Sequence, residues 1–182
     1  MPRSPHQPDS LPAVPSFPPT HASLAGARHH AAAGGTPYLL LKDHPGGIRV
    51  VAMNRPKVKN AFDDWLFLAL ADMFNHAEAD DSCKAVVLTG SGDIFTSGAD
   101  LKQDGSLKTG EGFTKDPTGV FMRVMLRFPK PIVAAVNGDA IGIGSTLLAH
   151  CDIVYSVDSA TFWTPFSRIA LVPEFCSTVL FP

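Results

Sequence analysis

The sequence has few cysteines, almost no net charge and no long apolar run. Its three cysteines form no CxxC pair, which argues against a disulfide framework and favours a reducing compartment. The net charge of −2 argues against nucleic acid or an anionic membrane surface as the main partner. No apolar stretch approaches the roughly 20 residues that a membrane helix needs, so we expect no membrane span. With 182 residues, the chain can form one globular domain with a real core.

Residues 1–37 differ in composition from the rest of the chain. They are rich in proline, histidine and alanine, and they hold eight of the sixteen prolines. This composition predicts a disordered N-terminal tail. A mitochondrial leader is the alternative, because the stretch is poor in acidic residues and carries Arg3 and Arg28. The adjacent His29 and His30 could bind a metal, but solvated tail residues are the favoured interpretation.

From residue 38 onward, apolar runs of strand length alternate with stretches of helical spacing. We predict strands at residues 38–42, 48–53, 85–89, 132–136 and 152–157, and helices at 62–77, 120–128 and within the glycine-rich stretch 138–150. The turn signal at 44–47 joins the first two strands into a hairpin, and Asn60 is a candidate cap for the first helix. The stretch 91–119 should end as a mobile surface loop. This alternation predicts an α/β fold with βαβ crossovers.

Two turns of small residues each follow a predicted buried strand. The first is FTSGADL at 95–101, and the second is NGDAIGIG at 137–144. Small residues let a backbone approach a ligand closely, and the amide hydrogens of such turns can face developing negative charge. The two turns could together form an oxyanion hole. From spacing alone, however, a tight packing turn is the favoured alternative for each of them.

Four stretches of the sequence match the motifs of a known family. The strings SGADL and NGDAIGIG, about 40 residues apart, and NRPKVKNAF at 54–62 resemble the crotonase (enoyl-CoA hydratase/isomerase) superfamily. The final stretch, ATFWTPFSRIALVPEFCSTVLFP at 160–182, resembles the peroxisomal Δ3,Δ2-enoyl-CoA isomerases and the related chromodomain-Y acyl-CoA-binding modules. The resemblance covers residues 38–182, which is the whole of the predicted globular core.

The resemblance implies a crotonase-like spiral of ββα units that takes an acyl-CoA thioester as its substrate. It implies no separate cofactor and no metal. The thioester oxygen would sit between two backbone amides, which fall here at Ala99 and Ile143. The other residues that would line the substrate site are Ser97, Gly98, Asp100, Leu101 and Gly142.

The resemblance also places the segment 57–62 beside the nucleotide part of CoA. Ala61 would contact the nucleotide through its backbone. Lys57 or Lys59 could meet a phosphate, and a solvated basic loop is an equally good interpretation of each lysine.

The acidic residues indicate which reaction the family resemblance favours. Hydratases of this family use two glutamates to activate water, and these would fall at Thr146 and Phe166, neither of which can act as a base. Glu174 stands where the peroxisomal isomerases place their single catalytic glutamate. One glutamate suffices to shift a double bond, so the resemblance implies a Δ3,Δ2-enoyl-CoA isomerase of fatty-acid β-oxidation. The alternative for Glu174 is a helix N-terminal carboxylate that follows Pro173.

Several residues around Glu174 bear on this interpretation. Apolar neighbours should raise its pKa toward the working pH, and we expect them to be Phe162, Trp163, Phe166, Leu171 and Val172. Phe175 replaces the glycine that usually follows the catalytic glutamate, so it should alter the turn or fill the acyl channel. Asp139 replaces a usual proline beside the second turn, and an inward-pointing carboxylate there would oppose enolate formation.

Family members continue past the position of Pro182 with several helices that complete the core and build a homotrimer. We therefore expect an incomplete crotonase-like fold, lacking those C-terminal helices, with exposed apolar surface. A non-catalytic acyl-CoA-binding or interaction module, or an inactive truncated copy, is the alternative function. The resemblance implies a peroxisomal location, with a mitochondrial one as the alternative, although the end of the sequence shows no peroxisomal signal.

Overall fold

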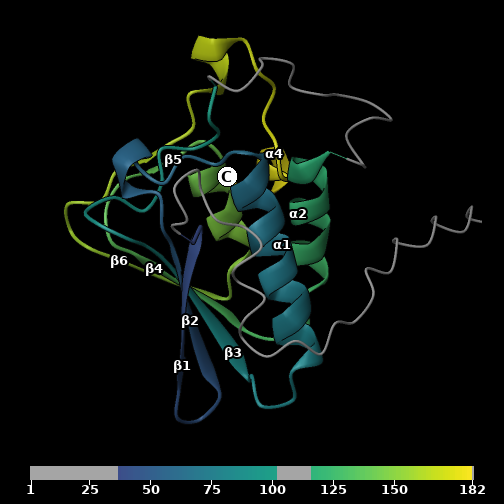
Figure 1. The fold of residues 1–182 in the computed structure, drawn as a ribbon. Helices are drawn as coiled ribbons and strands as arrows, with labels where there is room; N and C mark the ends of the chain where they lie inside the picture. The colour runs from purple at the N-terminus through teal and green to yellow at the C-terminus, as the bar shows by residue number, and fades with distance from the viewer. Residues whose placement is uncertain (1–36, 102–115, 182) are drawn as a thin grey trace, which may run out of the picture.

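A five-stranded sheet with two helices on one face forms the centre of the computed structural model, which describes residues 37–101 and 116–181 (Figure 1). The strands lie in the spatial order β1 (Leu39–His44), β2 (Ile48–Met53), β3 (Ala85–Gly90), β4 (Ile132–Val136) and β6 (Ile153–Ser156). β1 and β2 pair antiparallel, as the predicted hairpin requires, and the other neighbours are parallel. The α/β class is confirmed, and the strands match the predicted runs to within two residues.

The helices α1 (Asp64–Ala79) and α2 (Pro117–Arg127) pack against each other over the sheet (Figure 1). Side chains alternate between buried and half-buried along β2, β3 and β4, so one face of the sheet meets these helices. Burying a large apolar side chain in this layer contributes about 1.5–3 kcal/mol. The layer therefore supplies much of the stability of the fold.

The cap of α1 is not the predicted residue. Asp63 is the N-cap, and its Oδ1 accepts a hydrogen bond of 2.8 Å from the Leu66 amide. The amide of Asn60 instead donates to the carbonyls of Ser91, Ile94 and Phe95. Both residue types cap helices well, but the backbone of Asn60 is left-handed, with a φ of +52°, and places its side chain across the loop.

The glycine-rich stretch 138–150 folds into three short elements. They are β5 (Ala140–Ile141), the single turn α3 (Ile143–Thr146) and the 3₁₀ turn η4 (Leu147–His150). β5 pairs in parallel with β7 (Phe162–Trp163), which makes a second, two-stranded sheet. The remaining short elements are η2 (Pro56–Val58), η5 (Phe166–Ile169) and α4 (Ser177–Leu180).

Large apolar side chains are exposed in the part of the chain that follows β4, as expected. All four residues of β6 are exposed, including Tyr155 at 67%, and so are both residues of β7. Val172 and Val179, which flank the segment around Glu174, are exposed at 79% and 83%. Most of the large apolar side chains that are exposed in the described residues therefore lie after β4.

Some of the predictions fall on parts of the chain that lie outside the described residues. These are the tail at 1–36 with His29 and His30, and most of the predicted loop end at 102–115. Within 37–101 and 116–181, no helix is both long and apolar enough to cross a membrane.

Candidate functional site

The first small-residue turn is held in place by Thr96. The buried Thr96 hydroxyl donates to the carbonyl of Asn60 over 2.7 Å and accepts from the amide of Gly98 over 3.1 Å. The turn then pairs with the segment before α1, because Phe62 donates to the Gly98 carbonyl and Asp100 donates back to Phe62, both over 2.8 Å. These bonds fix the backbone on either side of Ala99.

The second turn is bound on both of its flanks. The Ile141 amide donates to the Thr96 carbonyl over 3.0 Å, which joins this turn to the first one. The Gly142 amide donates to the Trp163 carbonyl over 2.8 Å. The Ser145 hydroxyl donates to the Ala140 carbonyl and accepts from the Trp163 amide, so β5, β7 and α3 are held together at one point.

Both predicted oxyanion amides remain available for a ligand. In the part of the chain that the structure describes, no group accepts a hydrogen bond from the backbone amide of Ala99 or of Ile143. Their neighbours Gly98, Asp100 and Gly142 are all engaged. Ile143 is the first residue of α3, where an amide has no partner within the helix. Each turn therefore offers a donor where the resemblance placed one.

The two turns lie directly against each other. Gly98 and Gly142 both have positive φ, +89° and +56°, which favours glycine. A Cβ built on Gly142 would lie 3.9 Å from the Cα of Gly98. That distance is an ordinary contact, so the positive φ is what favours glycine at 142, whereas a Cβ on Gly98 would lie only 2.8 Å from the Ile141 carbonyl oxygen. The geometry accordingly brings the segments of Ala99 and Ile143 together, although these residues are 44 positions apart in the sequence.

The predicted CoA-binding segment lies beside the first turn. The Lys59 carbonyl accepts from the Ser97 amide over 2.9 Å, and Ala61, two residues further along the chain, is buried. Lys57 and Lys59 are both exposed, so each side chain is free to reach a ligand phosphate or simply to remain in solvent. Leu101 is also exposed and follows the turn.

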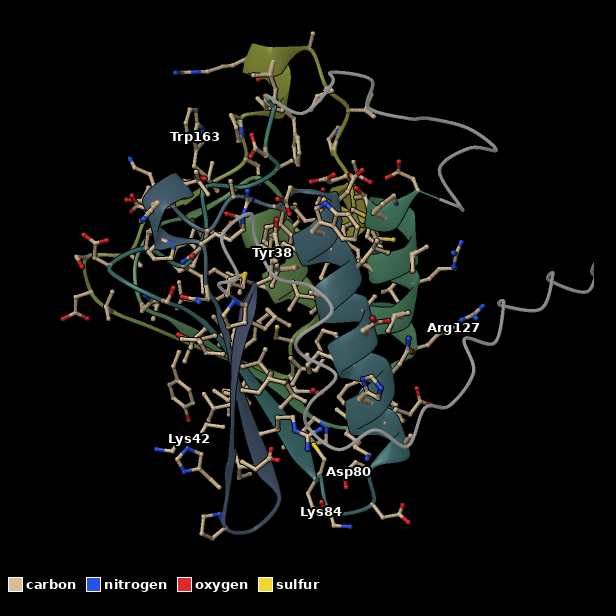
Figure 2. All side chains as sticks on the ribbon, viewed as in Figure 1. Tyr38, Lys42, Asp80, Lys84, Arg127 and Trp163 are labelled. Atoms are coloured by element: carbon tan, nitrogen blue, oxygen red, sulfur yellow. The ribbon has the colours of Figure 1, made fainter. Side chains whose placement is uncertain are left out.

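A largely buried ionic cluster lies at this edge of the site, and no pattern in the sequence predicted it. Arg55 forms an ion pair of 2.8 Å with Asp63 and a longer one of 3.8 Å with Asp100, which follows Ala99. The Tyr38 hydroxyl donates to Asp63 over 3.0 Å. Figure 2 shows Tyr38 beside the upper end of α1. Burial, together with the hydrogen bond to Asp63, raises the pKa of Tyr38.

The pKa of Glu174 is raised, as predicted. Its side chain is half-buried, and burial raises the pKa of its carboxyl to about 7. No described residue donates a hydrogen bond to the carboxyl or forms an ion pair with it. The alternative of a helix N-terminal carboxylate does not hold, because α4 begins only at Ser177 and its N-cap is Cys176. A carboxyl with a pKa near neutrality suits proton transfer.

Phe175 is buried, and its backbone lies in the left-handed region. Its φ is +53°, and that of Cys176 is +58°. The ring is buried, packs edge-on against Phe121 at 6.2 Å, and lies 4.0 Å from the ring of His150. Phe121 in turn contacts Phe62 at 6.0 Å. One aromatic cluster thus connects the Glu174 turn to the segment that pairs with Ala99.

The five apolar residues predicted around Glu174 differ in their burial. Phe166 is buried, Leu171 is half-buried, and Phe162, Trp163 and Val172 are exposed. Trp163 lies at the outer side of the molecule (Figure 2) and stacks with Arg168, whose guanidinium carbon is 5.3 Å from the ring centre. Burial raises the pKa of Glu174, and it stays a prediction that these five residues supply that burial.

The positions where hydratases carry their glutamates hold buried side chains that cannot exchange protons near neutral pH. Thr146 is fully buried and its hydroxyl donates to the Ile143 carbonyl over 3.4 Å, while Phe166 is buried at 8% exposure. The Asp139 carboxylate accepts a hydrogen bond of 3.1 Å from the Thr161 amide. This bond directs Asp139 toward Thr161. Among the described residues, no group of three potential ligands could hold a metal ion.

The comparisons with known proteins agree with one another. The family profile described as enoyl-CoA hydratase/isomerase matches residues 43–182. The mouse protein "Enoyl-CoA delta isomerase 3, peroxisomal" is 41% identical over 143 residues, which are 75% of this chain and 44% of that protein. The Escherichia coli (strain K12) "1,2-epoxyphenylacetyl-CoA isomerase" is 35% identical over 150 residues, which are 75% of this chain and 54% of that protein.

Solved structures share the same fold. The enoyl-CoA hydratase/isomerase from Pseudoalteromonas atlantica T6c superposes with a TM-score of 0.72 and 39% identity, covering 80% of this chain and 57% of that one. The predicted crotonase-like fold is therefore confirmed. The chain spans about half the length of the relatives that it matches.

Proposed function

The chain belongs to the enoyl-CoA hydratase/isomerase family, and from that premise we propose that it acts as a Δ3,Δ2-enoyl-CoA isomerase. The observation that carries the proposal is a single carboxyl, Glu174, whose pKa is raised to about 7, in a site where both hydratase positions lack an acid. Similarity to a peroxisomal delta isomerase supports the choice of reaction. We extend the proposal to fatty-acid β-oxidation in the peroxisome.

The proposed reaction needs one base and one anion-binding site. The Glu174 carboxylate takes a proton from C2 of a 3-enoyl-CoA, and the electron pair moves onto the thioester oxygen to form an enolate. The amides of Ala99 and Ile143 donate hydrogen bonds to that oxygen. The protonated Glu174 then gives its proton to C4. The electron pair on oxygen reforms the thioester carbonyl, and the double bond moves from C3–C4 to C2–C3. No water enters the product, which is consistent with Thr146 and Phe166 at the hydratase positions.

The acyl-CoA would bind along the edge that the two turns form. Lys57 and Lys59 are exposed beside the first turn, so either can pair with a phosphate of CoA. The Ala61 backbone lies between them and the buried Phe62. Replacing both lysines by alanine should weaken binding of the thioester and lower its dependence on salt, because fewer charge pairs remain to be screened.

A turnover assay tests the proposal directly. The purified 182-residue chain is given trans-3-hexenoyl-CoA, and the conjugated 2-enoyl thioester is followed by its absorbance. We expect conversion by the chain and none by Glu174→Gln, which should still bind the thioester. Glu78→Gln is the matched control, because Glu78 is exposed on α1 and far from the turns in sequence.

Three results would separate the candidate functions. Conversion that survives in Glu174→Gln would remove Glu174 from its proposed role. Thioester binding without conversion by the unsubstituted chain would identify a non-catalytic acyl-CoA-binding module. Hydration of a 2-enoyl-CoA at a rate above the isomerisation would contradict the assignment drawn from Thr146 and Phe166.

A further inference from the structure

His150 contacts the residue that follows Glu174. Its Nε2 lies 2.8 Å from the carbonyl oxygen of Phe175, although 25 residues separate the two in sequence. The two rings also lie 4.0 Å apart at an angle of 33°. His150 thus binds the backbone of Phe175 and packs on its side chain at the same time.

The chemistry of this contact shows which nitrogen of the histidine ring carries a hydrogen. A carbonyl oxygen can only accept a hydrogen bond, so Nε2 of His150 must carry the hydrogen and donate it. Both the neutral ring with its proton on Nε2 and the doubly protonated ring can do so. Nε2 of His150 is therefore the donor to the Phe175 carbonyl.

The turn that His150 holds has an uncommon backbone. Phe175 and Cys176 follow each other with φ of +53° and +58°, a conformation that side chains other than glycine rarely adopt. Such conformations persist where the surrounding structure imposes them. For Phe175, the surrounding groups are the Phe121 ring, the His150 ring and the His150 Nε2–H.

His150 also belongs to the stretch that carries the second candidate amide. It ends η4, which continues directly from α3, and α3 begins at Ile143. These helical turns are buried from Ile143 to Leu148 and so form a fixed support. A bond from this support to Phe175 ties the Glu174 turn to the element that presents the Ile143 amide.

We propose that His150 is a positioning residue, which holds the Glu174 carboxyl in its half-buried place by donating to the Phe175 carbonyl. This inference rests on the proposed function only in assigning Glu174 as the proton shuttle. The geometric part, that the bond from His150 holds the backbone next to Glu174, stands apart from the reaction. The raised pKa of Glu174 is what a carboxyl held away from solvent should show.

The test follows the Glu174 carboxyl itself and does not require turnover. The chain has three glutamates, so labelling the glutamate side-chain carboxyl carbon with ¹³C gives few signals, and Glu174→Gln identifies the one that matters. His150→Phe keeps a stacking ring but removes the donor. His150→Gln removes the ring but places an amide donor near the position of Nε2. Thermal unfolding monitored by circular dichroism shows that each variant is folded.

We expect Glu174 to titrate near 7 in the unsubstituted chain and at least about one unit lower in His150→Phe. His150→Gln should remain close to the unsubstituted chain. In the isomerase assay, His150→Phe should lower kcat about 10- to 100-fold with little change in KM, because the carboxyl is misplaced while the thioester still binds.

Two sets of results would overturn the inference. One is the same Glu174 pKa in His150→Phe as in the unsubstituted chain, or an ordinary pKa in both. The other is an equal loss in His150→Gln and His150→Phe, since packing of the ring would then explain the effect without the bond. A chain that shows the expected titrations but no turnover would contradict the isomerase proposal and still support the positioning role.

Discussion

Gly98 packs against the carbonyl oxygen of Ile141 so closely that a Cβ on Gly98 would lie 2.8 Å from it. The same glycine has a φ of +89°, which residues other than glycine rarely adopt. Two independent constraints therefore require glycine at this position. The consequence is that the turn carrying Ala99 can approach the turn carrying Ile143.

Replacing Gly98 by alanine should damage both the fold and the site. We expect a loss of about 1–3 kcal/mol in the free energy of unfolding, because the backbone is strained and the added methyl meets backbone. Turnover should fall about 100-fold or more, since the Ala99 amide would move relative to the Ile143 amide. Urea unfolding and the isomerase assay measure the two effects.

Gly46→Ala is the matched control for this substitution. Gly46 has a similar φ of +83°, but a Cβ there would meet nothing within 4 Å. It lies in the turn between β1 and β2. Gly46→Ala should lose less stability than Gly98→Ala, because it has the strain without the clash, and it should keep its turnover. Equal turnover in the two variants would contradict the role given to Gly98.

The pH dependence of turnover should follow the acidity of Glu174. Its pKa is about 7, and the carboxylate form must be present to take the C2 proton. The rate should therefore fall about tenfold for each pH unit below 7 and level off above it. A rate profile between pH 5 and 9 at saturating substrate measures this, and a midpoint near 4.5 would exclude Glu174 in the half-buried state as the base.

The sequence predicted the layers of this fold well, because strand and helix spacing depend on local burial. The runs at 48–53 and 132–136 are strands with the predicted bounds, and their alternation of buried and half-buried residues follows the pleat. The prediction that Asn60 caps α1 was wrong, because Asn60 and Asp63 are both good cap residues. Only the left-handed backbone of Asn60, which the sequence does not reveal, decides between them.

Glycines in the sequence marked the two turns of the candidate site, and no described group accepts a hydrogen bond from the amides of Ala99 and Ile143. The oxyanion role of these two amides stays a prediction. The burial of the residues expected around Glu174 did not follow from closeness in sequence, because Trp163 and Val172 are exposed. The contact from His150 comes from another element 25 residues away, and no periodicity signals it.

Glu174 should also make the stability of the chain depend on pH. In the folded state its pKa is raised from 4.5 to about 7, so the folded state binds more protons than the unfolded state between these values. The free energy of unfolding must then decrease as the pH rises from about 4.5 to about 7. Glu174→Gln should match the unsubstituted chain near pH 4.5 and exceed it by about 1–3 kcal/mol at pH 8.

Denaturant unfolding of the two proteins at both pH values measures this difference. Other titrating groups change both proteins equally, so they cancel when the two free energies are subtracted. A Glu174→Gln chain that is less stable than the unsubstituted chain at pH 8 would mean that the carboxylate stabilises the fold, contrary to burial as the cause of its raised pKa.

At position 175, glycine should destabilise the fold less than alanine, which is the reverse of the usual order. Its φ of +53° costs alanine about 1 kcal/mol or more and glycine almost nothing, whereas in ordinary strands and helices alanine is the better residue. Both substitutions lose the packing against Phe121 and His150, which should cost about 3–5 kcal/mol. We therefore expect Phe175→Gly to be destabilised, but to be more stable than Phe175→Ala by about 1 kcal/mol.

Urea unfolding of the two variants decides this order, and the packing term cancels between them because both remove the ring. Ala170 provides the reference, since it also has a positive φ, of +55°, but is exposed and has no ring to lose. Ala170→Gly should gain stability from relief of strain, offset in part by the greater freedom of glycine in the unfolded chain. If Phe175→Ala proved the more stable variant, the turn after Glu174 would not be held in the left-handed region.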